Sequence, residues 1–243
     1  MKKLPLVLIS LLLLGSGHPV NETILEKVDR NMSSKNRIIE ATMTIYGKRN
    51  SRTLTSKTWS EGSKKSFTEY LSPASDKGTK MLKLEGQLWI YSPSTDRTIQ
   101  ISGNMLRQSV MGSDLSYEDM MDDRKMTELY TEKLIGREVI DGRKTWVLKL
   151  TARVDNVAYY AQKMWVDTAR YVPLKQELYA KSGQLLKKLE YKDVKNIQGR
   201  WFPHSFIYKD MLKDGNGTEF KITSIQFDQV IPPYLFTKAA LKQ

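Results

Sequence analysis

The residue types that most often carry out catalysis are scarce in this chain. It has no cysteine, and its two histidines are His18 and His204, the latter alternating with Phe206 and Tyr208 as on a strand. A lone histidine on a strand is more often a structural group than a base. The sequence also lacks a G-x-S-x-G nucleophile motif, a P-loop and a dinucleotide-binding fingerprint. We therefore predict no catalytic residue, no metal site and no cofactor, and expect that the protein is not an enzyme.

One group of carboxylates could bind a cation. It consists of Glu118, Asp119, Asp122 and Asp123. The segment lacks the alternating oxygen ligands and the glycine turn of a calcium loop. Arg124 and Lys125 follow it directly, and such mixed charges are typical of a solvated helix face. We favour that interpretation over a cation site.

Binding of an apolar ligand suits the composition better. Methionine and leucine gather between residues 102 and 126, where polar and apolar residues no longer alternate. Methionine is flexible and polarizable, so it repacks around ligands of different shape, although it also fills gaps in ordinary cores. Burial gains roughly 0.8 kcal/mol per methylene, or up to about 12 kcal/mol for sixteen carbons. A lid that packs into the empty cavity would offset part of this gain. The lid candidates are Met105, Leu106, Met111, Leu115, Met120 and Met121.

Alternation of apolar and polar residues predicts the strands that must position this lid. Residues 39–46, 145–150 and 174–181 show it clearly, and turn signals such as Glu85-Gly86 and Asp141-Gly142 separate about eleven strand candidates. Helical spacing predicts a helix over residues 21–32, capped by Asn21, and another near residues 117–130, capped by Ser116. A change of parity between residues 222 and 225 predicts a β-bulge.

These elements indicate a mainly β protein with helices, in which a large antiparallel sheet curls or splits to cover its apolar face. A strongly curved sheet leaves a concave surface that side chains or a ligand must fill. We expect one domain, residues 18–243. The candidates for its cavity wall are Met43, Ile45, Trp59, Leu84, Ile99, Ile101, Trp146, Leu148, Leu150 and Phe206.

The first residues have the three parts of a secretory signal. Lys2 and Lys3 precede an apolar run over residues 4–14, and residues 15–17 are small. We predict cleavage after Gly17, since the alternative, a membrane anchor, needs about 20 apolar residues. Without a cysteine the protein cannot be lipidated at this point. The net charge of +12 favours transient contact with an anionic membrane surface, with simple solubility as the alternative. No basic tail or RNA-binding motif indicates nucleic acid.

Several motifs together resemble the periplasmic outer-membrane lipoprotein-sorting (LolA-like) superfamily, in its longer and poorly characterised branch. They are Leu88-Trp89-Ile90-Tyr91-Ser92-Pro93, Trp165-Val166-Asp167, Gly199-Arg200-Trp201-Phe202-Pro203, Ile231-Pro232-Pro233-Tyr234-Leu235-Phe236, and the more specific Tyr70-Leu71-Ser72-Pro73 with Lys77-Gly78-Thr79-Lys80-Met81-Leu82. The resemblance covers nearly the whole chain from about residue 22 onward.

The resemblance implies a half-open antiparallel β-barrel closed by a helical lid, with a cavity for acyl chains. It implies a periplasmic carrier that moves lipoproteins or lipids toward the outer membrane. Its partners would be an inner-membrane transporter of the ABC or RND type and an outer-membrane acceptor. Arg107 and Arg124 are the candidates for a lid-locking arginine. The alternatives are a periplasmic lipid or lipoprotein sensor and an accessory subunit of an RND-type exporter.

Overall fold

The computed structural model describes residues 22–122 and 124–243. The predicted signal segment, its cleavage site, His18, Asn21 and Asp123 lie outside the described residues. The strands are β1 (Asn36–Tyr46), β2 (Ser51–Glu61), β3 (Lys65–Ser72), β4 (Lys80–Leu84), β5 (Gln87–Ser92), β6 (Arg97–Ile101), β7 (Tyr130–Ile140), β8 (Arg143–Ala152), β9 (Ala161–Asp167), β10 (Pro173–Tyr179), β11 (Leu185–Ile197), β12 (Arg200–Asp210) and β13 (Gly217–Phe227).

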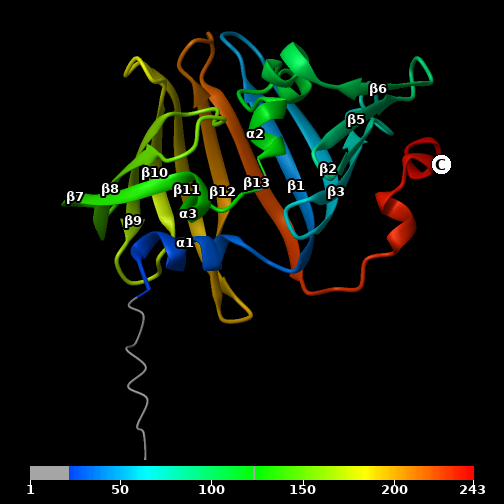
Figure 1. The fold of residues 1–243 in the computed structure, drawn as a ribbon. Coiled ribbons are helices and arrows are strands. Elements are labelled where there is room, and N and C mark those ends of the chain that lie inside the picture. Colours follow the sequence, from blue (N-terminus) through cyan, green and yellow to red (C-terminus); the bar gives the residue numbers. More distant parts are fainter. Residues whose placement is uncertain (1–21, 123) are drawn as a thin grey trace, which may run out of the picture.

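In the described part of the chain these strands form one 13-stranded antiparallel sheet, in the order β6-β5-β4-β3-β2-β1-β13-β12-β11-β10-β9-β8-β7. Figure 1 shows it as a curved wall. The sheet is open, because β6 and β7 are its two edges and do not pair with each other. The prediction of a large antiparallel sheet is confirmed, with more strands than the sequence indicated.

Local sequence signals explain the turns and the bend. Glu85 and Gly86, and likewise Asp141 and Gly142, both have positive φ, as a two-residue hairpin turn of type I′ requires. The predicted bulge is present: Ala41 pairs with Ile222, whereas the preceding Glu40 pairs with Ser224. The residue between the two partners is extra, and it bends β13.

The two faces of the sheet are covered by different segments. On the concave face, α1 (Ile24–Met32) packs with α3 (Met126–Leu129) against one hydrophobic cluster from β8 and β9. On the convex face, the C-terminal turns η3 (Pro233–Phe236) and η4 (Lys238–Lys242) cover β3, β4 and β5. Thr23, and not Asn21, caps α1, through a capping box with Glu26. None of the described helices has the length and hydropathy of a membrane span.

The segment that interrupts the strands lies over the concave face. We call residues 102–122 the lid; it contains η1 (Gly103–Arg107), η2 (Val110–Gly112) and α2 (Tyr117–Met121). Figure 1 shows α2 in front of the middle of the sheet. Ser116 caps α2 as predicted, but the single helix expected near residues 117–130 is divided into α2 and α3. The backbone of Asp122 is extended at the break, and its carboxylate accepts hydrogen bonds from Arg124.

Candidate functional site

A cavity of about 380 Å³ lies between the lid and the concave face of the sheet. The strands β1, β2, β3, β12 and β13 supply its walls, and the lid supplies Val110, Leu115 and Met120. Ligand pockets of proteins usually measure about 300–1,000 Å³. The volume of this open cavity is therefore at the lower end of the range for a bound small molecule.

One wall of the cavity is aromatic and aliphatic. It consists of Ile39, Ala41, Phe202, Phe206, Tyr208, Phe220 and Ile222. The rings meet edge to face, with centroids 5.5 Å apart for Tyr208 and Phe220 and 6.1 Å apart for Phe202 and Phe206. This geometry is favourable for aromatic pairs and leaves a continuous apolar surface.

The opposite wall carries hydroxyl groups. It consists of Ser56, Thr58, Ser60, Thr68 and Tyr70, from β2 and β3. The hydroxyls of Thr58 and Thr68 lie 2.9 Å apart and bond to each other. The cavity is therefore amphipathic, with an apolar side formed by β12 and β13 and a polar side formed by β2 and β3.

A buried ion pair holds the lid on the sheet. Asp119 of α2 accepts hydrogen bonds from Nζ of Lys187 on β11, at 2.5 Å, and from the hydroxyl of Tyr159, at 2.5 Å. The side chains of Lys187 and Asp119 are only 8% and 10% exposed. This corrects the expectation that Asp119 belongs to a solvated helix face, because α2 turns this carboxylate toward the sheet.

The protonation of the pair follows from its contacts. Burial alone would raise the pKa of the Asp119 carboxyl, but the Lys187 ammonium and the hydrogen bonds from Lys187, Tyr159 and Ser116 outweigh it. The pKa therefore lies below its ordinary value of 3.8. Burial, and then the Asp119 carboxylate, raise the pKa of the Tyr159 phenol far above 10.0. Both groups thus stay in the states that keep the lid attached.

Two further contacts fasten the lid on either side. The carboxylate of Asp114 accepts hydrogen bonds from the Thr218 hydroxyl and the Asp210 amide, at 2.8 and 2.9 Å. On the other side, Nζ of Lys83 on β4 donates to the carbonyl oxygen of Met120 at 2.8 Å. The lid is thus tied to both halves of the sheet by polar groups, while its apolar side chains face the cavity and the core.

The structure brings the predicted lid residues together. All six pack against one hydrophobic cluster, which consists of Met43, Leu54, Tyr70, Met81, Leu88, Ile101, Val110 and Tyr117. The six lid residues are Met105, Leu106, Met111, Leu115, Met120 and Met121. Of the predicted wall residues, Phe206 lines the cavity, and Met43, Ile45 and Ile101 lie in or against the cluster beneath the lid.

The remaining predicted wall residues lie elsewhere. Leu148, Leu150 and Trp146 are on the concave face but pack beneath α1, where Leu148 and Leu150 are fully buried. Trp59 and Leu84 are on the convex face, against the C-terminal turns. On β2, Thr58 and Ser60 line the cavity, and Trp59 between them points to the other face of the sheet. The residues of β2 that face the lid are therefore the even-numbered ones. Ile99 is half exposed on the edge strand β6.

Of the two arginine candidates, Arg124 links the end of the lid to the connection between β8 and β9, because it donates to Asp122 and to the carbonyl and side chain of Asn156. Arg107 lies in the last turn of η1. The missed residues carry a signal that is visible in the sequence: Lys187 alternates with Leu185 and Leu189 on β11, so it falls on the apolar face of its strand.

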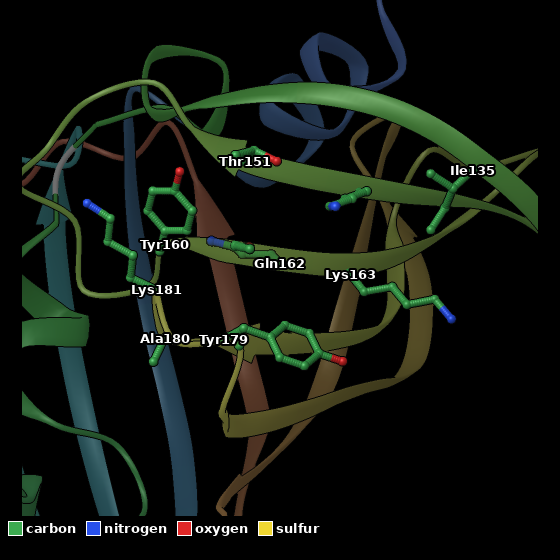
Figure 2. A pocket seen from close by; sticks show the side chains of 11 residues that line it. Ile135, Thr151, Tyr160, Gln162, Lys163, Tyr179, Ala180 and Lys181 are labelled. Carbon is green, nitrogen blue, oxygen red and sulfur yellow. The ribbon is translucent and has the colours of Figure 1, made fainter.

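A second groove, of about 540 Å³, lies on the convex face over β8, β9 and β10. Figure 2 shows Tyr160 and Lys181 together at one end and Ile135 and Lys163 at the other. The strand register places Lys133, Lys149 and Lys163 side by side on three neighbouring strands. We call these three residues the lysine row. Like charges directly opposite each other are unfavourable, and Glu138 offsets part of this repulsion because its carboxylate lies 3.6 Å from Nζ of Lys163.

Comparisons with known proteins agree with this architecture. A family model described as an uncharacterised protein matches residues 62–243. Three solved structures are similar: a DUF1329 family protein from Desulfovibrio piger (25% identity, 90% of this chain and 96% of that one, TM-score 0.81), an outer membrane lipoprotein-sorting protein domain from Vibrio parahaemolyticus (26%, 90% and 98%, 0.77), and a LolA superfamily protein from Nitrosomonas europaea (28%, 89% and 97%, 0.71). A search of curated proteins finds no match. The chain therefore belongs to the family that this model defines, within the LolA-like superfamily of outer-membrane lipoprotein-sorting proteins.

Proposed function

We propose that the protein is a periplasmic carrier that binds the acyl chains of lipoproteins or lipids and moves them toward the outer membrane. The observation that carries this proposal is the apolar cavity beneath a methionine-rich lid. Similarity to an outer membrane lipoprotein-sorting protein domain supports it. The concave wall would hold the chain, and the lid would exclude water from it.

The size of the cavity supports a lid that moves. The cavity volume of about 380 Å³ is small for a lipid with several acyl chains, since pockets for drug-sized ligands already measure about 300–1,000 Å³. Cargo of that size must displace Leu115 and Met120, which line the cavity from the lid. Moving these side chains out of the cavity costs packing energy, which offsets part of the roughly 0.8 kcal/mol gained per methylene, so the cargo can be released.

The direct test is native mass spectrometry of the protein purified from the bacterial envelope, with extraction of whatever lipid accompanies it. A bound lipid or acylated peptide supports a carrier. An apo mass that stays unchanged after incubation with lipoproteins and phospholipids contradicts it, and favours a sensor or an exporter subunit that works through a protein partner.

A variant that fills the cavity tests its location. Ala41 on β1 lines the cavity, so Ala41→Phe should displace several methylenes of cargo and weaken binding of a fluorescent fatty acid by at least roughly tenfold. Thr42→Phe is the matched control, because the next residue on the strand points to the other face. Equal affinities of the two variants would place the cargo elsewhere.

The same function requires contact with membranes, and we propose that the lysine row makes it. Each lysine near an anionic surface contributes about 1 kcal/mol, so Lys149→Gln with Lys163→Gln should weaken binding to phosphatidylglycerol vesicles roughly 25-fold. Lys64→Gln with Lys77→Gln removes the same charge from exposed turns in the other half of the sheet. An equal loss in both double variants would mean that only net charge matters.

A further inference from the structure

The cavity contains one formal charge among its described lining residues. Arg37 of β1 lines it together with Ile39 and Ala41, which follow on the same face of that strand. The other lining side chains are apolar or carry hydroxyl groups. Arg37 is half-buried, and a cation beside an aromatic wall needs a physical explanation, because charges that lose solvent contact are normally paired.

The protein supplies little to pair with this guanidinium. Its recorded hydrogen bond goes to the carbonyl oxygen of Met32, at a long 3.5 Å. A guanidinium has five N–H donors, so most of its capacity remains. The charged group that acts on Arg37 among the described residues is another cation, Arg200; burial, and then this neighbour, lower the pKa of Arg37. Arg200 thus adds a second positive charge near Arg37.

The neighbours of Arg37 can complete a site for an anion. Ser60 is its direct cross-strand partner on β2 and is 7% exposed, with its side chain on the same cavity wall. Thr58 and Thr68 follow along that wall. Hydroxyl groups donate hydrogen bonds to carboxylate or phosphate oxygens, and an arginine can bind two such oxygens at once.

We propose that the cavity selects an anionic amphiphile: an acyl chain that ends in a carboxylate or a phosphate, with the anion on Arg37 and Ser60 and the chain along the aromatic wall. The inference rests on the proposed carrier function, because it assigns a cargo class to the same cavity. A neutral lipid would fill the apolar side equally well, but it would leave the guanidinium desolvated without a strong acceptor, which is costly.

The experiment compares cargoes that share their acyl or alkyl chain length and differ in whether the head group is anionic or neutral. Binding of palmitate and of hexadecanol to the wild-type protein is measured by displacement of a fluorescent probe, and phosphatidic acid against diacylglycerol forms a second pair. Inorganic phosphate alone is the third arm. A charged hydrogen bond distinguishes ligands by roughly ten- to hundredfold, so palmitate should bind at least about tenfold more tightly than hexadecanol. A preference confined to the second pair would identify phosphate as the anion.

Variants then assign the preference to Arg37. Arg37→Met should abolish it while hexadecanol binding changes less than about twofold, and Arg37→Lys should restore part of it. Arg97→Met, at the exposed start of β6, should behave as wild type. The wild-type comparison remains decisive if Arg37→Met does not fold.

The outcomes separate this inference from the carrier function. If neutral and anionic partners bind equally in both pairs, or if Arg37→Met keeps the preference, the inference is overturned and the carrier function stands. Binding of inorganic phosphate as tight as that of the lipids would overturn it too, because the chain would then contribute nothing. Binding of no lipid at all overturns both.

Discussion

The ion pair between Lys187 and Asp119 allows a quantitative test of how the lid is held. We predict that Lys187→Met lowers the free energy of unfolding by about 3 kcal/mol, the lower end of the range for breaking a buried pair by removing one partner. The lower end applies because the Asp119 carboxylate, 10% exposed, would lose its cation but keep the hydrogen bonds from Tyr159 and Ser116.

The magnitude should depend on both partners. In the double variant of Lys187→Met with Asp119→Asn, neither charge is buried, so the loss should be smaller than the sum of the two single losses. The difference, the coupling energy, should be about 2–3 kcal/mol. Asparagine also retains an oxygen that can serve the cap of α2, so that helix should survive in the double variant.

Urea unfolding followed by circular dichroism measures these energies, and stopped-flow uptake of a fluorescent fatty acid reports on the lid. Lys187→Met should take up the probe faster, because the lid is held by fewer bonds. Lys188→Met is the control, since that half-buried lysine sits one residue along and points to the other face. A loss below about 1 kcal/mol for Lys187→Met, with additive double-variant energies, would refute the role of the pair.

Three other results are expected. Acidification should destabilise the protein, because the pKa of the Asp119 carboxyl lies below 3.8 in the folded state. The stabilising contribution of this carboxylate is present above pH 3.8 and is lost as the pH falls through the folded pKa. Urea titrations of the wild-type protein and of Asp119→Asn at several pH values would show this loss. Thr23→Ala should cost about 1 kcal/mol in thermal unfolding, because the capping box with Glu26 is lost; no change would mean that α1 is held by packing alone. Gly217→Ala should lower the free energy of unfolding by more than about 1 kcal/mol, because Gly217 has φ +95° and a Cβ there would lie 2.6 Å from the carbonyl oxygen of Tyr208. Chemical denaturation would measure this loss. An unchanged free energy would show that β12 and β13 can separate at this point.

The strand pattern could be predicted because the sheet is built from consecutive hairpins. Alternation gives the faces of each strand, and turn residues give the ends, so β1, β8 and β10 follow from local sequence. The bulge at the Ile222–Ser224 step was likewise visible as a change of parity. These features depend on neighbouring residues and need no knowledge of the overall curvature.

The walls of the cavity could not be predicted in the same way. Parity says that Trp59 and Thr58 face opposite sides of β2, but the curvature of the whole sheet decides which side meets the lid. Leu148 faces the concave side as expected, yet α1 covers it. The length and path of the covering segments, and not the strand pattern, divide the concave face into a filled core and a cavity.

The polar residues of the site were missed even though Lys187 alternates with Leu185 and Leu189, because alternation alone does not say which strand face is covered. Arg37 and Lys187 lie on the inner faces of their strands, where charged residues are rare. Alternation along a strand separates its two faces but does not say which of them is the inner one. The partner of Lys187, Asp119, is 68 residues away in the sequence, and no local pattern connects the two. Long-range pairs of this kind require the structure.

The place where β1 meets β13 has a consequence for when the protein can first work. Each half of the sheet can form from local hairpins between consecutive strands. The junction of the halves pairs Arg37 with Phe227, so it must wait for the final strand, and joining segments so distant in sequence is slow. Because Ile39, Ala41, Phe220 and Ile222 on the two sides of this junction line the cavity, the separate halves of the sheet have no complete binding site. Binding begins only after β1 and β13 have paired.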